Sequence, residues 1–110
     1  MQQSAQLHLK NTGLSDSHQQ ILIELFKKYL RDKNCTVYLF GSRAKGTHAR
    51  SSDIDIAVAS DESIDRELSL VRMECEESNL PYTVDVVDLL EAGEPLRRRV
   101  LEEGVIVWKS

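Results

Sequence analysis

Apolar residues along this chain follow two alternating spacings, which predict helices and strands in turn. Intervals of three and four predict helices over 15–34, 61–79 and 94–103. Short runs rich in β-branched and aromatic residues predict strands at 35–40, 54–59, 82–87 and 105–108. The basic stretch after residue 40 contains Gly46 and Thr47, and we expect a loop with a short helix there.

The predicted helices also carry signals for their ends. Ser15 or Ser17 can cap the first helix, and Asn34 is a candidate for its end. Pro81 closes the second helix, whereas the last one has Pro95 at its start and Gly104 just beyond it. The segment 88–91 resembles a further capping box that leads into a short turn.

This order of elements predicts an α/β fold: a small mixed β-sheet of about four strands, with helices covering one face. The connection between the first two strands is open to two interpretations, a short crossover helix or an antiparallel link. We expect one domain over 1–110, in which 1–13 form an N-terminal extension or, through the alternation at Leu7-His8-Leu9, an edge strand.

Composition excludes several classes of function. The net charge of −4 argues against broad binding to nucleic acid. No apolar run is long enough to span a membrane, and the first residues lack the pattern of a signal peptide. Cys35 and Cys75 have no metal-ligand spacing, so we expect reduced thiols in a cytoplasmic protein.

Two acids in the second predicted strand are the main candidates for chemistry. Asp53 and Asp55 are two residues apart, so their carboxylates share one face while Ile54 and Ile56 point to the core. Two carboxylates so near to each other repel, so one of them binds a proton more tightly or both bind a cation. Mg²⁺ is a suitable cation for such ligands. Asp85, in the third predicted strand, would add a third ligand and permit a two-metal site. The alternative is a solvated strand face without a ligand.

The turn before these acids is suited to binding phosphate. Gly41 permits a positive φ and a close approach of the backbone to a ligand, and Ser42 adds a hydroxyl group. Arg43 and Lys45 bring positive charge to the place where a triphosphate would lie. A P-loop needs lysine at the position of Thr47, so we set that interpretation aside. Turn and acids together indicate nucleotidyl transfer.

The other charged residues are weaker candidates. We expect Asp88 to be a helix cap, Arg97-Arg98-Arg99 to lie on a solvated face, and His48 not to touch phosphate. Phe26 and Trp108 are most simply core residues.

The chain resembles the DNA polymerase beta-like nucleotidyltransferase superfamily through Gly41-Ser42, Asp53-Ile54-Asp55 and Asp85. More narrowly, it is similar to the minimal nucleotidyltransferase (MNT) family over nearly its full length, including 5–7 and 80–88. The resemblance implies that Gly41 and Ser42 bind the nucleotide phosphates, that Asp53 and Asp55 ligate two Mg²⁺ ions (Mn²⁺ being an alternative), and that Asp85 ligates one of them and helps to deprotonate the acceptor hydroxyl.

The MNT resemblance also implies a partner and a reaction. Family members are encoded beside a small helical HEPN protein, and the two form a toxin–antitoxin pair in which MNT is the antitoxin. The leading hypothesis is therefore transfer of AMP from ATP to a hydroxyl group, such as a tyrosine, of a HEPN toxin. Two alternatives remain: a nucleotide-binding module that neutralises the partner by occlusion, and an enzyme that modifies a small molecule such as an antibiotic. A homodimer or a mixed oligomer with the partner is compatible with each.

Overall fold

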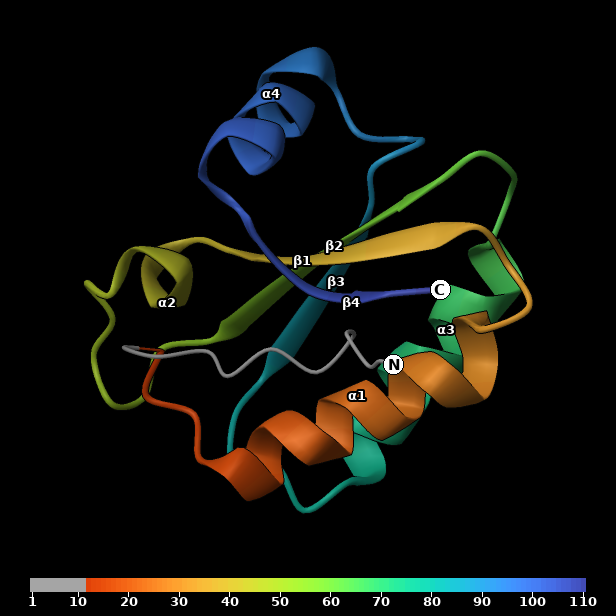
Figure 1. Ribbon diagram of the computed structural model, residues 1–110. Helices are drawn as coiled ribbons and strands as arrows, with labels where there is room; N and C mark the ends of the chain where they lie inside the picture. The colour runs from red at the N-terminus through yellow and green to blue at the C-terminus, as the bar shows by residue number, and fades with distance from the viewer. Residues whose placement is uncertain (1–11) are drawn as a thin grey trace, which may run out of the picture.

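The computed structural model describes residues 12–110, which form a four-stranded sheet between layers of helices (Figure 1). The extension over 1–13 and its edge strand at 7–9 therefore fall almost entirely outside the described residues. The elements in chain order are α1 (Asp16–Leu30), β1 (Cys35–Phe40), α2 (Ser42–Lys45), β2 (Ile54–Ser60), α3 (Asp65–Glu77), β3 (Val84–Asp88), α4 (Glu94–Glu103) and β4 (Val105–Lys109).

The sheet has the strand order β3-β2-β1-β4 and is mixed, as expected. β1 pairs antiparallel with β2 and with β4, whereas β2 and β3 are parallel. The link between β1 and β2 thus joins antiparallel strands and also contains the short helix α2. α3 is the crossover that a parallel pair requires.

Helices cover both faces of the sheet, so the prediction of a single covered face is wrong. α1 and α3 lie on one side and α4 on the other (Figure 1). The larger core lies beneath α1 and α3 and includes Phe26 and Trp108, which are 0% and 3% exposed. A smaller cluster joins α4 to the second face through Val100, Phe40, Ala57 and Leu89. The candidate site lies on that second face.

The observed helix ends confirm the predicted cap of α1 and differ from the prediction at other positions. Ser15 is the N-cap of α1, and its hydroxyl accepts a hydrogen bond from the His18 N–H at 3.1 Å. α1 ends at Leu30 rather than at Asn34, whose side-chain amide instead donates to Asp61 at 3.2 Å. α3 begins at Asp65, four residues later than predicted, because 61–64 form the link that leaves β2. It ends at Glu77, before the predicted 79.

The segment after β3 differs more from the prediction. β3 extends to Asp88, whose side chain accepts a hydrogen bond from the Leu90 N–H at 3.0 Å and so caps a turn. The predicted helix-capping role of Asp88 is therefore wrong, because α4 starts only at Glu94, with Gly93 as its N-cap. The limits of α4 and of β1 agree with the prediction.

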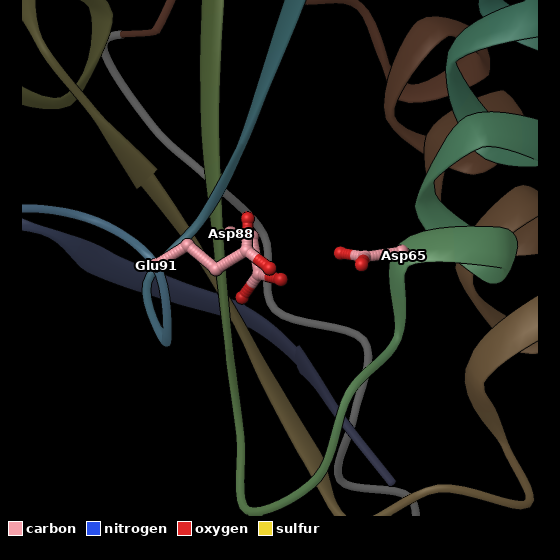
Figure 2. A group of neighbouring side chains, drawn as sticks. All are labelled: Asp65, Asp88 and Glu91. Carbon is pink, nitrogen blue, oxygen red and sulfur yellow. The ribbon is translucent and has the colours of Figure 1, made fainter.

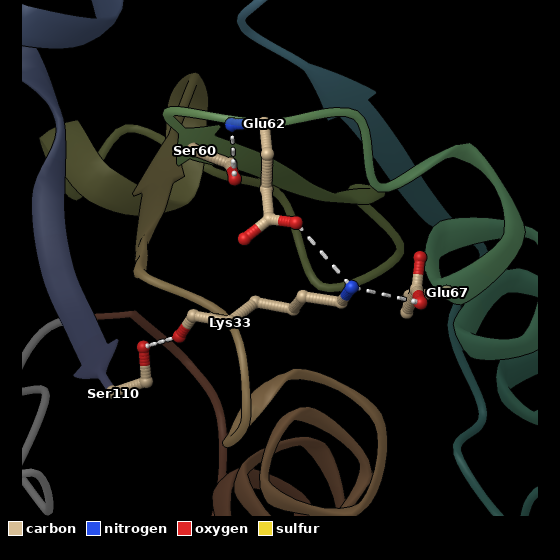
Figure 3. Close-up of polar contacts among 5 residues, drawn as sticks. All are labelled: Lys33, Ser60, Glu62, Glu67 and Ser110. Atoms are coloured by element: carbon tan, nitrogen blue, oxygen red, sulfur yellow. Dashed lines mark hydrogen bonds and ion pairs between the residues drawn. The ribbon is translucent and has the colours of Figure 1, made fainter.

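A polar cluster around Lys33 lies near Ser60 (Figure 3). The register of β1 and β2 places Ser60 at the opposite end of the sheet from the pair Phe40 and Asp55. Lys33 lies between Glu62 and Glu67, with nitrogen–oxygen distances of 3.5 and 3.7 Å. Glu62 first, and then Glu67, raise the pKa of Lys33. The Ser110 hydroxyl donates to the Lys33 carbonyl, which ties the end of β4 to the link between α1 and β1. The Lys33 ammonium group thus offsets part of the negative charge of the two glutamates.

Among the described helices, none is long and apolar enough to cross a membrane.

The packing of α3 predicts opposite outcomes for two of its residues. Leu68 is 1% exposed, so Leu68→Ala should lower the free energy of unfolding by about 2–5 kcal/mol. Met73 is 48% exposed on the same helix, and Met73→Ala should cost less than about 1 kcal/mol. Urea denaturation of both variants measures the difference. Equal losses would contradict the way in which α3 faces the core.

Candidate active site

Three carboxylates meet where β2 and β3 begin. Asp53 immediately precedes β2, and Asp55 is the second residue of that strand. The parallel register places Asp55 opposite Asp85 of β3, and Ile54 opposite Val84. Because paired residues on neighbouring strands project to the same face, Asp55 and Asp85 lie side by side. The structure thus brings the three predicted acids together.

The alternation along β2 assigns these acids to the face that α4 covers. Ile54 and Ile56 are 0% and 1% exposed in the larger core, as predicted. Asp55 shares its face with Ala57, which packs in the cluster beneath α4. Asp55 is half-buried, whereas Asp53 and Asp85 are exposed. The acids therefore lie in the part of this face that α4 leaves open.

Crowding of these acids affects the pKa of the central one, Asp55. Burial, followed by the charges of Asp85 and Asp53, raises the pKa of Asp55 above its ordinary value. Such a group of hard oxygen ligands fits a divalent cation of the Mg²⁺ or Mn²⁺ type, since a bound cation would relieve the repulsion between the carboxylates.

The turn after β1 lies directly against Asp55. Gly41 has a φ of 76°, which favours glycine, and a Cβ atom at this position would come within 2.3 Å of Asp55 Oδ2. Ser42 follows as the first residue of α2, where backbone N–H groups have no partner inside the helix. The turn therefore provides backbone donors beside the carboxylates, and a side chain at position 41 would collide with one of them.

Lys45 lies on α2 and forms an ion pair with Glu103 of α4, at 3.2 Å. The side chains are 52% and 43% exposed, so water screens this pair strongly. Lys45 therefore remains accessible from solvent, although part of its charge is compensated by α4.

Arg43 occupies a different place from the one that its position in the turn predicted. Its side chain is buried, with 1% exposure. Nη1 donates to the Thr12 carbonyl at 2.6 Å, while Nε and Nη2 donate to the Ser52 carbonyl at 3.1 and 2.9 Å. Nη2 also donates to the Arg50 carbonyl at 3.2 Å, and the guanidinium lies 4.5 Å from the centre of the Tyr82 ring. The predicted contact of Arg43 with phosphate is therefore wrong, because its donors are used within the protein.

These contacts give Arg43 a role in positioning Asp53. The Ser52 carbonyl that accepts two of its hydrogen bonds belongs to the peptide group that leads into Asp53. The same guanidinium joins residue 12, the loop between α2 and β2, and the ring of Tyr82 just before β3. No sequence signal distinguishes this buried arginine from a solvated one in a glycine-rich turn.

The weaker candidates, His48 and the run of three arginines, lie outside the group of acids. His48 is half-buried next to Gly13, where a Cβ atom would approach its Nε2 within 2.4 Å. Arg97 donates to the carbonyl groups of Leu89 and Ala92, at 3.2 and 2.9 Å. Arg98 and Arg99 are exposed, so the solvated face predicted for this run applies to two of its three residues.

Comparison with known proteins gives a consistent result. The family model for polymerase beta nucleotidyltransferases matches residues 20–110. The protein adenylyltransferase MntA of Shewanella oneidensis is 40% identical over 87 residues, which are 74% of this chain and 60% of that protein. The MntA protein of Haemophilus influenzae is 33% identical over 108 residues, 96% of this chain and 88% of that one. The chain thus matches less than two thirds of the Shewanella protein and most of the Haemophilus protein.

Several solved structures with a similar fold are toxin–antitoxin complexes. A chain from a toxin–antitoxin structure with AMP-PNP has a TM-score of 0.70 at 30% identity, over 84% of this chain and 73% of that one. A chain from the complex of tri-AMPylated Shewanella oneidensis HEPN toxin with MNT antitoxin has a TM-score of 0.58, also at 30% identity, with the same coverage.

The raised pKa of Asp55 predicts how stability depends on pH without metal. The folded chain holds this proton more tightly than the unfolded chain, so stability falls as pH rises from about 3.8 through the pKa of the folded state. Asp55→Asn removes that loss. In metal-free buffer the variant should melt above the wild type at pH 7, and the difference should vanish below pH 3.8. Asp32→Asn, at an exposed turn, is the control and should show no such gain.

The contacts of Arg43 predict that its loss acts on folding. Arg43→Lys keeps the charge but cannot reproduce the forked hydrogen bonds, so it should lower the free energy of unfolding by about 2–4 kcal/mol. Arg50→Lys is the control, since the Arg50 side chain is exposed. Chemical denaturation measures both variants. A variant at position 43 with wild-type stability and weakened binding of ATP would restore the phosphate role.

Proposed function

The chain belongs to the polymerase beta nucleotidyltransferase family, in its MNT branch, and we propose that it transfers AMP from ATP to a hydroxyl group of a partner HEPN toxin. We expect the acceptor to be a tyrosine and the transfer to make this chain the antitoxin of the pair. The observation that carries the proposal is the meeting of Asp53, Asp55 and Asp85 beside the Gly41-Ser42 turn, in a chain whose relatives include protein adenylyltransferases.

The geometry supports distinct roles for the acids. Asp53 and Asp55 lie at the start of β2, and their side chains project from the same face. Together they would hold two divalent cations. Asp85, the exposed partner of Asp55 in the register, would hold one cation and lie next to the acceptor hydroxyl. When bound, Mg²⁺ or Mn²⁺ supplies Lewis-acid stabilisation of the charge that develops on the phosphates and on the attacking oxygen.

The turn supports the position of the nucleotide. Gly41 allows the chain to pass close to Asp55, so phosphates bound by the N–H groups after Ser42 would lie next to the cation ligands. Lys45 is the remaining basic residue of the predicted phosphate set, and its weak pair with Glu103 leaves it free to turn toward a triphosphate. Arg43 would contribute indirectly, by fixing the peptide before Asp53.

The open setting of the site supports a macromolecular acceptor. Asp53 and Asp85 are exposed, so the described residues provide one wall of the site and leave the acceptor side open. A partner protein that presents its hydroxyl group can supply the other wall and exclude water during transfer. A mixed assembly with the HEPN protein follows from this arrangement.

Co-expression with the HEPN protein of the neighbouring gene tests the proposal. Wild-type chain should add one or more AMP units to that protein, measured by intact mass. Asp53→Asn and Asp55→Asn should each reduce the rate of transfer by more than about 100-fold. Loss of a residue that merely hydrogen-bonds to a metal ligand already costs about 10- to 100-fold in metal affinity or activity, and loss of a ligand should cost more.

Asp32→Asn, an exposed aspartate far from the site, is the matched control and should transfer at the wild-type rate. Circular dichroism should show that all variants are folded. An unmodified HEPN protein that binds the wild type and both variants equally, and is neutralised by all of them, would replace catalysis with occlusion. Full transfer by either variant would refute the role of the acids.

A further inference from the structure

A second group of carboxylates lies on the other face of β3. The oxygen atoms of Asp65, Asp88 and Glu91 come within 4.8 Å of one another. Asp65 is the first residue of α3, Asp88 is the last of β3, and Glu91 belongs to the turn before α4 (Figure 2). Three separate elements thus direct acids toward one point.

Asp88 provides an independent indication of a ligand. Its side chain is 9% exposed. Oδ1 accepts a hydrogen bond from the Leu90 N–H, but Oδ2 is buried and has no hydrogen-bond partner among residues 12–110. A buried carboxylate oxygen without a partner is disfavoured unless a proton or a cation satisfies it. In Figure 2 the carboxylate groups of Asp88 and Glu91 overlap in the view, and that of Asp65 points toward them.

The charges around the cluster do not balance. Asp65 first, and then Asp88, raise the pKa of Glu91, while Arg72 acts in the opposite direction. Arg72 uses Nε and Nη2 to donate to the Val86 carbonyl, at 3.2 and 2.8 Å. One guanidinium beside three carboxylates leaves two negative charges, which is the charge that one divalent cation neutralises.

We propose that Asp65, Asp88 and Glu91 bind a hard divalent cation of the Ca²⁺ type, and that this cation joins the start of α3 to the turn that follows β3. Ca²⁺ accepts carboxylates in irregular arrangements and completes its shell with water, whereas Mg²⁺ usually relies on one or two carboxylates and substrate phosphates. The inference concerns stability and does not depend on the proposed function.

The proposed site is separate from the candidate active site. Asp88 follows Asp85 by three residues, which corresponds to about 10 Å along the strand and to the opposite face of the sheet. A cation at Asp88 therefore cannot be shared with Asp53, Asp55 or Asp85, and substitutions in one group can be separated experimentally from those in the other.

Calorimetric titration with Ca²⁺ and thermal unfolding, with EDTA or with Ca²⁺, test the proposal on the whole chain. Asp88→Asn keeps an oxygen for the Leu90 N–H, and Glu91→Gln alters only an exposed side chain. The double variant Asp53→Asn/Asp55→Asn removes the other acidic group. Glu94→Gln, an exposed acid in the first turn of α4, is the matched control.

The wild type, the double variant and the control should each bind Ca²⁺ at this site and melt at least about 5 °C higher when Ca²⁺ exceeds its dissociation constant 100-fold. Introduced into the double variant, which lacks the other cation ligands, Asp88→Asn and Glu91→Gln should each abolish this gain, and in EDTA they should melt above the double variant because repulsion is reduced. A wild type without any Ca²⁺-dependent gain, or a gain that disappears in the double variant and persists in Glu91→Gln, would overturn the proposal.

Discussion

The alternation of side chains along β2 is the constraint on which both the core and the candidate active site depend. Ile54 and Ile56 enter the larger core, and Asp55 and Ala57 occupy the opposite face. Because this period is two residues, a slip of one position would bury the carboxylate in the apolar core and expose the isoleucines. The register of β2 is therefore strongly specified, and the same register sets Asp55 beside Asp85. The strand register that buries the isoleucines therefore also brings Asp55 and Asp85 together.

The Lys33 cluster and the candidate active site, at opposite ends of the sheet, differ in how far their charges are compensated. At one end Lys33 lies between Glu62 and Glu67, and its ammonium group offsets part of their negative charge. At the other end Asp55 meets further carboxylates, and burial together with their charge raises its pKa. Uncompensated charge lowers stability unless a ligand relieves it, and it is therefore retained chiefly where binding or catalysis requires it. This excess of negative charge, which the candidate active site shares with the cluster of Asp65, Asp88 and Glu91, distinguishes both from the Lys33 cluster.

Features that depend on neighbouring residues in the sequence were predictable, whereas features that depend on contacts between distant residues were not. The strands and α4 were predictable because periodicity and terminal signals are local, and the shared face of Asp53 and Asp55 follows from strand geometry alone. The segment before α3 makes contacts with residues far away in the sequence, from Asp61 to Asn34 and from Glu62 to Lys33, which no local pattern predicts. The turn at Asp88 is local, but the sequence does not show whether the Asp88 side chain caps a turn or a helix. Arg43 is the clearest case: its hydrogen bonds reach residues 12, 50 and 52, and its ring contact reaches Tyr82. No local pattern distinguishes such an arginine from one that faces a ligand.

The burial of Arg43 changes how the proposed reaction must be balanced electrostatically. With that guanidinium committed to backbone carbonyl groups and Lys45 partly compensated by Glu103, the described residues around Gly41 bring more negative than positive charge to the site. A triphosphate approaching three carboxylates would be repelled. On the proposed function, neutralisation must then come from divalent cations held by those same carboxylates, with backbone N–H groups fixing the phosphates. Affinity for nucleotide should accordingly depend on the cation far more than on any single basic side chain, which makes the acids binding residues as well as catalytic ones.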